Sequence, residues 1–369
     1  MSVILALLAL FLSVAAGVVP TAIYVLIVWW IDRYEKEPIK LLACALLWGA
    51  IPAGILSFVL EALSQGPVME LSREYSQLVG TSVVAPLVEE CVKGLALLGL
   101  FWLARRDFDD VLDGIVYGSI VGFGFAMSEN ILYFLRAWMR GGFPSWTITV
   151  LGRALAFGFN HAMFTSFTGI GFGLARYERL RGRRVLFILL GLMAAITAHF
   201  AHNFWLAVGG FCVLSFLLDW TGVLVVFVII LLAWHRESAW LATELPEEVS
   251  AGVLTPLQFE TVTFRRGRLR HGWQLLGISG LRQARLWRQL AEASTELAFK
   301  KHQQARMGEE KGNSTAIAAL RAKILRIRQE LGEEAVAESH ICAACGRPSA
   351  KDAGHACPYC QTPWPESQG

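Results

Sequence analysis

The sequence predicts an all-α polytopic membrane protein, a bundle of about seven transmembrane helices followed by a cytoplasmic helical hairpin and a small zinc ribbon. Three observations support this fold class. Residues 1–234 consist mainly of apolar runs, several of them as long as the roughly 20 residues needed to cross a bilayer. From His235 onward charged residues are frequent, and the C-terminal end holds two closely spaced pairs of cysteines. The net charge of +3 is too small to indicate nucleic-acid binding.

Seven apolar runs are long enough to be membrane spans, and basic residues orient them. The predicted spans are 3–30, 41–63, 82–104, 111–135, 148–175, 185–208 and 211–234. Lys and Arg cluster after the first, third and fifth spans and are fewer in the other loops. Because cytoplasmic loops carry an excess of basic residues, we expect a multi-pass protein of the cell membrane with its N-terminus outside and its C-terminal tail in the cytoplasm.

Composition divides the chain into four expected parts. These are a transmembrane domain at 1–235, a linker with a basic patch at 236–271, a helical cytoplasmic segment at 272–337 and a zinc-ribbon-like module at 338–369. Apolar residues at helical spacing predict two amphipathic helices in the third part, at about 272–305 and 314–336. The basic patch from Arg265 to His271 either contacts anionic lipid headgroups or is simply solvated.

Four cysteines near the C-terminus have the spacing of a structural zinc site. The pattern is C-x2-C followed by a second C-x2-C, formed by Cys342, Cys345, Cys357 and Cys360. Four thiolates close a tetrahedral zinc site, so this zinc would be structural and not catalytic. Two disulfides are the alternative, which a reducing cytoplasm disfavours. A module of this kind often docks a protein partner.

The third span contains charged residues in an otherwise apolar run. Glu89, Glu90 and Lys93 lie between Val83 and Leu103. A charge in hydrocarbon is costly, so ionisable residues in a span face the bundle interior and are functional candidates by default. On a helix, Lys93 is one turn from both glutamates and can pair with one of them. The other glutamate would then be available for chemistry or metal binding.

Three further spans carry polar groups at a similar depth. Glu129 lies in the fourth span, His161 in the fifth, and His199 and Asn203 in the sixth. With the predicted topology and 1.5 Å per helical residue, these groups and Glu89 lie roughly 10–20 Å below the outer interface. A single buried histidine is more often structural, but two histidine-bearing and two acid-bearing spans at one level indicate a site.

Such a site can hydrolyse a peptide bond in two ways. Carboxylates and imidazoles can hold a divalent metal, most readily zinc, that makes water nucleophilic. Alternatively, a carboxylate can act as general base on an unliganded water while His and Asn side chains stabilise the oxyanion. The chain lacks the H-E-x-x-H and G-x-S-x-G motifs of other hydrolases. Two other classes stay open: a cation or proton transporter, and a non-catalytic scaffold for the zinc-ribbon tail.

The ordered motifs resemble those of the PrsW-type intramembrane proteases, relatives of the CAAX-processing and bacteriocin-immunity membrane proteins. The resemblance covers about residues 20–235 and rests on D-R-Y-E-K-E-P from Asp32, E-E-x-x-K from Glu89, F-x-x-x-E from Phe125, and the later histidines. CAAX-type relatives have a histidine where Glu129 stands and a basic residue one step after Lys93. These departures argue against prenyl-protein processing.

The resemblance implies cleavage of membrane-anchored proteins, including anti-sigma factors. We expect Glu89 or Glu90 to be the general base, or one to be the base and the other a metal ligand. Glu129, His161 and His199 would bind a metal or polarise the scissile carbonyl. Lys93 would orient the glutamates, and Asn203 would supply an oxyanion hydrogen bond.

Overall fold

The computed structural model describes most of the chain, which divides into two compact units. The described residues are 3–32, 36–71, 75–105, 107–209, 212–309, 312–332, 339–341 and 348–350. The units are Met1–Ala233 and Trp234–Gly369. The predicted cysteine site, Cys342, Cys345, Cys357 and Cys360, lies outside the described residues. The zinc ribbon and the subdivision of the second unit therefore stay predictions.

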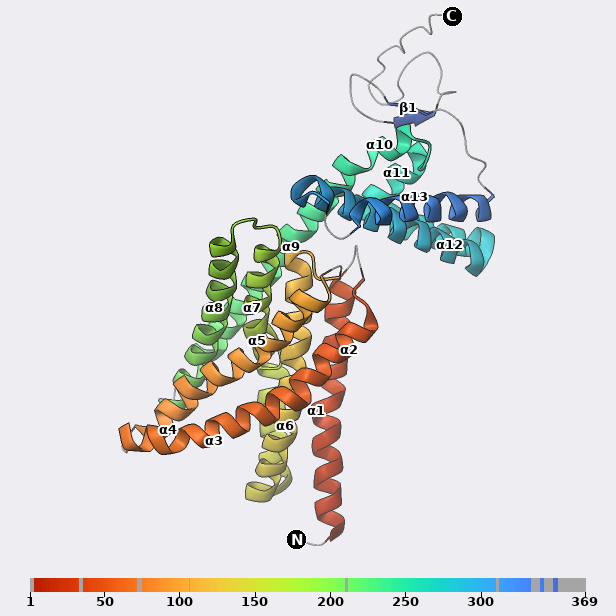
Figure 1. Ribbon diagram of the computed structural model, residues 1–369. Helices are drawn as coiled ribbons and strands as arrows, with labels where there is room; N and C mark the ends of the chain where they lie inside the picture. The colour runs from red at the N-terminus through yellow and green to blue at the C-terminus, as the bar shows by residue number, and fades with distance from the viewer. Residues whose placement is uncertain are drawn as a thin grey trace, which may run out of the picture. The chain divides into compact units, whose positions relative to one another are not determined.

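The first unit is a bundle of long helices (Figure 1). Its helices, with π-helical turns labelled η, are α1 (Val3–Ile31), α2 (Ile39–Trp48), η1 (Gly49–Ala53), α3 (Gly54–Leu71), α4 (Ser76–Val79), η2 (Gly80–Val84), α5 (Ala85–Leu103), α6 (Val111–Val150), η3 (Leu151–Ala156), α7 (Asn160–Arg176), α8 (Arg181–Ala207) and α9 (Cys212–Glu244), whose last part belongs to the second unit.

The second unit is also mainly helical. Its elements are α10 (Pro246–Ser250), α11 (Pro256–Thr263), α12 (Arg265–Met307), α13 (Asn313–Glu330), β1 (Ser339–Ile341) and β2 (Pro348–Ala350). The two short strands pair antiparallel, with His340 opposite Ser349. The unit's core includes a buried carboxylate, Glu248, which accepts two hydrogen bonds from Arg321, at 2.8 and 2.7 Å, and one from Lys301 at 2.9 Å.

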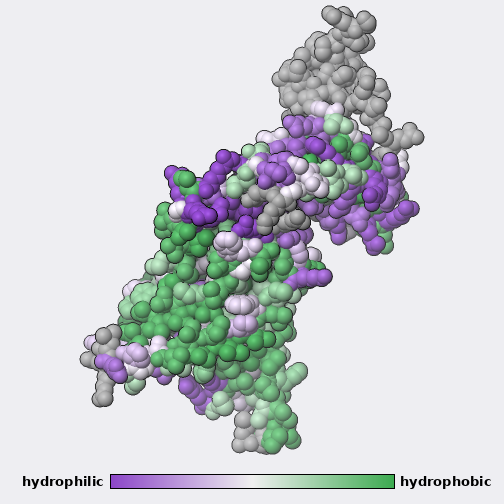
Figure 2. Space-filling model, viewed as in Figure 1, coloured by the Kyte–Doolittle hydropathy of each residue, from purple (hydrophilic) through white to green (hydrophobic). Residues whose placement is uncertain are grey.

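Five segments of the described chain are long and apolar enough to cross a membrane. They are Val3–Ile31, Ile39–Glu70, Val111–Arg176, Arg181–Ala207 and Cys212–Ser250. The outer surface of the first unit is accordingly rich in hydrophobic side chains (Figure 2). The protein is thus an all-α multi-pass membrane protein. The predicted span at 82–104 covers the end of η2 and all of α5; its three charged side chains lie within five residues, at Glu89, Glu90 and Lys93, and it is not among the five segments.

Glycines interrupt two of the long helices. The predicted spans 111–135 and 148–175 are separated by a break at Gly141 and Gly142, and the helix before the break extends a few residues past 135. The predicted helix at 272–305 is broken at Gly280, whose φ of +84° is one that L side chains rarely adopt. The composition of residues 272–305 gave no reason to expect the helix to reverse direction at Gly280.

The first half of α6 is the centre of the membrane unit. Asp110 caps its N-terminus through a capping box with Asp113, and every residue from Val111 to Ala126 is buried. A stripe of Gly114, Gly118 and Gly122 faces α7: a Cβ on these residues would lie 2.1 Å from Gly169 O, 2.7 Å from Thr165 O and 2.3 Å from His161 O, respectively. The glycine stripe therefore lets the two backbones meet, as small residues do in membrane bundles.

A second close crossing lies on the other side of α6. There a Cβ on Gly124 would lie 2.1 Å from Leu46 O, and one on Gly49 would lie 2.0 Å from Val121 O. The continuous helix formed by α2, η1 and α3 thus crosses α6 at backbone contact (Figure 1). Contacts on two sides fix α6 between α2 and α7, the helix that carries His161.

Buried carboxylates gather where α1, α2 and α6 meet. Asp32, just after α1, accepts a hydrogen bond from the backbone N–H of Glu37 at 2.8 Å, and Tyr117 donates its hydroxyl to Glu37. Asp32 and Glu37 are 2% and 4% exposed. Burial raises the pKa of Asp32 to about 7, and burial together with the charge of Asp113 raises the pKa of Glu37 well above its usual range.

Helix α12 is itself an antiparallel helical hairpin that reverses at Gly280. Across the reversal, the Arg268 guanidinium donates to Thr295 Oγ1 at 2.6 Å, and the indole N–H of Trp287 donates to Arg268 O at 3.4 Å. The rings of His271 and Trp287 lie 4.4 Å apart. Residues before and after Gly280 therefore pack along each other.

The glycine stripe predicts a selective effect of one added methyl group. Gly122→Ala should destabilise the protein by about 1–3 kcal/mol, because the Cβ would overlap the His161 carbonyl and force α6 from α7. Gly99→Ala, in α5, is the matched control, since nothing lies within 4 Å of its Cβ. Thermal unfolding in detergent measures the difference, and equal melting temperatures for the two variants would contradict the packing argument.

The buried Asp32 carboxyl predicts a pH-dependent stability. Its folded-state pKa of about 7 exceeds the usual value near 4, so its contribution to stability is complete below about pH 4 and is lost as the pH rises to 7. Asp32→Asn should therefore gain stability over the wild type at pH 8, and less so at pH 5. Melting temperatures across this range test it, with the exposed acid variant Glu70→Gln as control. A gain that does not change with pH would disprove it.

Candidate active site

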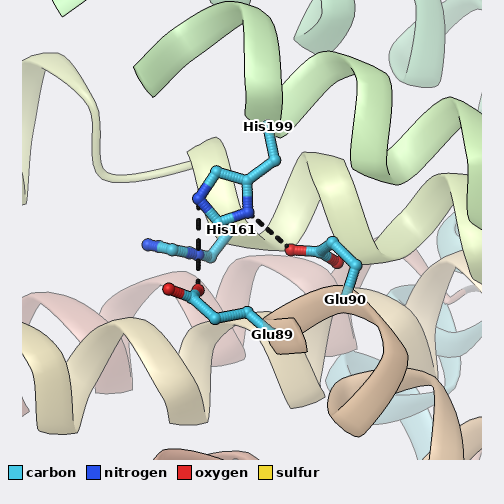
Figure 3. A group of neighbouring side chains, drawn as sticks. All are labelled: Glu89, Glu90, His161 and His199. Atoms are coloured by element: carbon cyan, nitrogen blue, oxygen red, sulfur yellow. Dashed lines mark hydrogen bonds and ion pairs between the residues drawn. The ribbon is translucent and has the colours of Figure 1, made fainter. Parts of the chain in front are cut away.

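Four buried side chains from three helices converge in the membrane unit. Glu89 and Glu90 come from α5, His161 from the first turn of α7 and His199 from α8 (Figure 3). One nitrogen or oxygen atom from each lies within 4.8 Å of the others. Glu90 is 0%, His199 2% and Glu89 6% exposed. The two predicted glutamates and the two predicted histidines therefore form one cluster.

Lys93 is the cation of this cluster. Its Nζ donates to Glu90 Oε1 at 2.7 Å and to Glu89 Oε2 at 3.2 Å, and lies 3.1 Å from His161 Nδ1. The side chain is fully buried. Its Nζ also lies 4.0 Å from the centre of the Phe125 ring, a cation–π distance. The lysine thus pairs with both glutamates, where the sequence indicated pairing with one.

The two glutamates have different surroundings. Both oxygens of Glu90 are engaged: Oε1 contacts Lys93 and lies 3.0 Å from His199 Nδ1, and Oε2 accepts from Thr165 at 3.1 Å. Glu89 uses Oε2 for Lys93, and that atom lies 4.0 Å from His199 Nε2. Among the described residues, no hydrogen bond to Glu89 Oε1 is found. Glu90 is therefore fixed, whereas Glu89 keeps an oxygen for chemistry.

A carboxylate lies behind each histidine. Glu129 Oε2 lies 3.0 Å from His161 Nε2, and the Arg153 guanidinium holds the same oxygen at 2.6 Å. Glu90 lies behind His199 in the same way, at Nδ1. Since carboxylates accept from imidazole N–H groups, the pattern assigns the protons to His161 Nε2 and His199 Nδ1. The other nitrogens, His161 Nδ1 and His199 Nε2, keep their lone pairs and face the cluster.

This donor set fits a divalent metal ion. Two imidazole nitrogens with lone pairs and one Glu89 oxygen match the His2Glu ligand set of catalytic zinc sites. The 4.0 Å between His199 Nε2 and Glu89 Oε2 is close to the roughly 3.5 Å between neighbouring zinc ligands. Carboxylates behind the histidines are the usual outer partners of metal-binding histidines. Lys93 Nζ lies 3.1 Å from His161 Nδ1 and 3.2 Å from Glu89 Oε2, so a metal ion would have to replace the lysine at both atoms.

Besides Lys93, two predicted site residues of the membrane unit lie outside the four-residue cluster. Glu129 contacts the cluster through His161. Asn203 donates its side-chain amide to Thr81 O at 2.8 Å, in η2. Arg153 pairs with Glu129 at 2.6 Å and also contacts Asn130 Oδ1 at 2.7 Å. The predicted role of Asn203 at the oxyanion stays a prediction.

Sequence reasoning missed a second buried network beside the cluster. Asp219 of α9 lies 2.7 Å from His202 Nδ1 and accepts from Asn160 Nδ2 at 3.0 Å; Ser215 Oγ lies 3.0 Å from His202 Nδ1. Asn160 directly precedes His161, and His202 follows His199 by one turn. The network therefore ties α9 to the two helices that carry His161 and His199. The sequence signals for it were the spacing of His202 from His199 and the carboxylate of Asp219 inside the span at 211–234.

Comparisons with known proteins agree on one family. Residues 37–234 match the family model described as PrsW family intramembrane metalloprotease. Protease PrsW of Geobacillus kaustophilus is 31% identical over 180 residues, which cover 48% of this chain and 72% of that protein. Protease PrsW of Clostridioides difficile is 29% identical over 180 residues, with the same coverage of 48% and 72%. Protease PrsW of Bacillus subtilis is 26% identical over 198 residues, covering 53% and 83%.

No solved structure matches the chain. The family match, in contrast, covers more than half of its residues and includes all four members of the buried cluster. The chain therefore belongs to the PrsW family of intramembrane metalloproteases.

Proposed function

We propose that this enzyme is an endopeptidase that cleaves membrane-anchored proteins at the Glu/His cluster, within the bilayer. The observation that carries the proposal is the convergence of four donor atoms from three helices, within 4.8 Å of one another, in the interior of a membrane unit. Glu129 and Arg153 are partly exposed, with side chains 24% and 28% accessible. We assign the approach of water and substrate to their side of the cluster.

Glu89, His161 and His199 are the residues we assign to a divalent metal, most readily zinc. Zinc, when bound, activates water as a nucleophile at neutral pH and polarises a carbonyl as a Lewis acid. Glu90 and Glu129 hold the two imidazoles in the orientation and tautomer that direct lone pairs at the cluster. Glu129, expected from sequence to be a ligand, thus becomes a positioning residue in this proposal.

Glu89 is also the glutamate we assign as general base, acting through Oε1, because Oε2 is the oxygen that faces the histidines. It alone of the pair has an oxygen without a hydrogen bond in the described part of the chain, and it is the more exposed of the two. A general base must reach the proton it removes, which the enclosed Glu90 carboxylate is less able to do. Thr165 and Lys93 keep Glu90 in place.

The finer topology and the substrate are also proposals. We propose seven spans, with α5 as the charged one, and a cytoplasmic tail, supported by the placement of Lys and Arg along the sequence. The family resemblance supports a membrane-anchored substrate, such as an anti-sigma factor. The spacing of the four C-terminal cysteines supports a structural zinc ribbon that docks a protein partner.

Cleavage of a membrane-anchored reporter in proteoliposomes tests the assignments. Glu89→Gln should lower kcat by about 10²–10⁴-fold, as loss of a general base does. Thr165→Val should lower it by about 10–100-fold, because it frees one oxygen of Glu90. Glu70→Gln, which alters an exposed acid of α3, is the control and should cleave normally.

The results distinguish a wrong proteolytic assignment from a wrong assignment of the two glutamates. Normal cleavage by a Glu90→Ala, His199→Ala double variant would remove the proteolytic assignment of this cluster. A larger loss from Thr165→Val than from Glu89→Gln would instead reverse the roles of the two glutamates. Membrane insertion of each variant, checked by alkaline extraction, shows that lost cleavage is not lost protein.

Metal content tests the metal site separately from activity. The purified full-length protein should hold two zinc ions, one lost on Cys342→Ser, Cys345→Ser substitution or on deletion of residues 338–369. The second should survive the deletion and disappear with His199→Ala, which removes a ligand. A truncated protein without metal would indicate a metal-free glutamate/histidine site and contradict the metal assignment.

A further inference from the structure

The tip of the α12 hairpin exposes large apolar side chains to solvent. Residues 273–281, the hairpin tip, include Trp273, Ile278 and Leu281, which are 70%, 85% and 76% exposed. The two arms behind the tip hold each other through Arg268, Thr295 and Trp287, so the tip is the turn of a packed hairpin. Three such side chains within nine residues give the tip a concentration of exposed apolar side chains, a feature that marks interaction sites.

Positive charge surrounds this apolar tip. From Thr261 to Ala291 the chain has no acidic residue, and its arginines are Arg265, Arg266, Arg268, Arg270, Arg282, Arg285 and Arg288. Arg268 points back into the hairpin. Arg270 on the first arm and Arg282 and Arg285 on the second are exposed on either side of the tip. An apolar tip with a collar of arginines matches the interface of an anionic bilayer.

The connection to the membrane unit favours lipid over other partners. Helix α9 begins in a candidate membrane span and ends at Glu244, so the second unit is tethered to a bilayer surface. Tethering raises the effective concentration of membrane at the hairpin, so even a weak interaction is populated. Tryptophan at the edge of the apolar tip is also typical of a membrane interface.

We propose that the α12 hairpin tip inserts into the surface of an anionic membrane. Trp273, Ile278 and Leu281 enter the boundary between headgroups and acyl chains, while Arg270, Arg282 and Arg285 contact lipid phosphates. The hairpin then gives the second unit a contact with the bilayer besides α9. The exposed charges on this surface differ from the basic patch expected from sequence, since they lie on both arms.

Photocrosslinking in the full-length protein tests this proposal. Benzoylphenylalanine replaces Ile278 or, as control, Leu325, an exposed leucine on α13 outside the tip. The protein is reconstituted in nanodiscs of phosphatidylcholine alone or with an equal amount of phosphatidylglycerol, and adducts are identified by mass spectrometry. We expect lipid adducts at position 278 in the anionic nanodiscs, with a yield at least about tenfold above that at 325.

The arginines have their own test in the same assay. Arg282→Gln with Arg285→Gln should lower the yield at position 278 in anionic nanodiscs by about fivefold per charge removed. Because these side chains are exposed, the variants should retain the wild-type melting temperature. Absence of lipid adducts at 278, or adducts to protein in their place, would overturn the proposal. A yield unaffected by phosphatidylglycerol or by the arginine variants would overturn the role of the charges.

Discussion

The ammonium group of Lys93 is the contact on which the membrane unit depends. It lies within 3.2 Å of both carboxylates of the glutamate pair and of His161 Nδ1. Without it, two adjacent carboxylates would be buried in a membrane bundle with no cation between them, at a cost of several kcal/mol or more. The lysine therefore makes an acidic site possible inside the bilayer. Because two carboxylates share one ammonium, the cluster still has negative charge to offer a divalent ion.

The geometry of the cluster depends in turn on how closely helices approach α6. The glycine stripe brings α7 to backbone contact at Gly122, level with His161. One turn further on, Phe125 covers Lys93 and lies 5.3 Å from the His161 ring. Glu129 reaches that same ring from the next turn. Successive turns of α6 thus give the close approach, the apolar cover and the carboxylate that set the position of one histidine.

How much of the site could be predicted depends on how far apart in the sequence its interacting residues lie. Span-embedded charges mark Glu89, Glu90 and Lys93 as functional, because hydrocarbon tolerates few such residues and the i, i+3 and i, i+4 spacing is local. That these residues lie at about the same depth in the membrane as His161 and His199 was predictable, because the rise per helical residue is constant. The roles of Thr165 and Arg153 were not, because they depend on the rotation of one helix against another. The reversal of α12 at Gly280 was missed because glycine also occurs within helices.

The same burial that makes the site possible links its chemistry to its stability. Each charged member of the cluster is the counter-ion or hydrogen-bond partner of another, so removing one leaves a buried group unpaired. A variant that empties a position can therefore lose activity through misfolding as well as through lost chemistry. Isosteric changes, which preserve volume and some hydrogen bonds, separate the two effects. On this argument, the engaged Glu90 contributes more to the fold than Glu89 does, and in the proposed mechanism the freer Glu89 contributes more to the reaction.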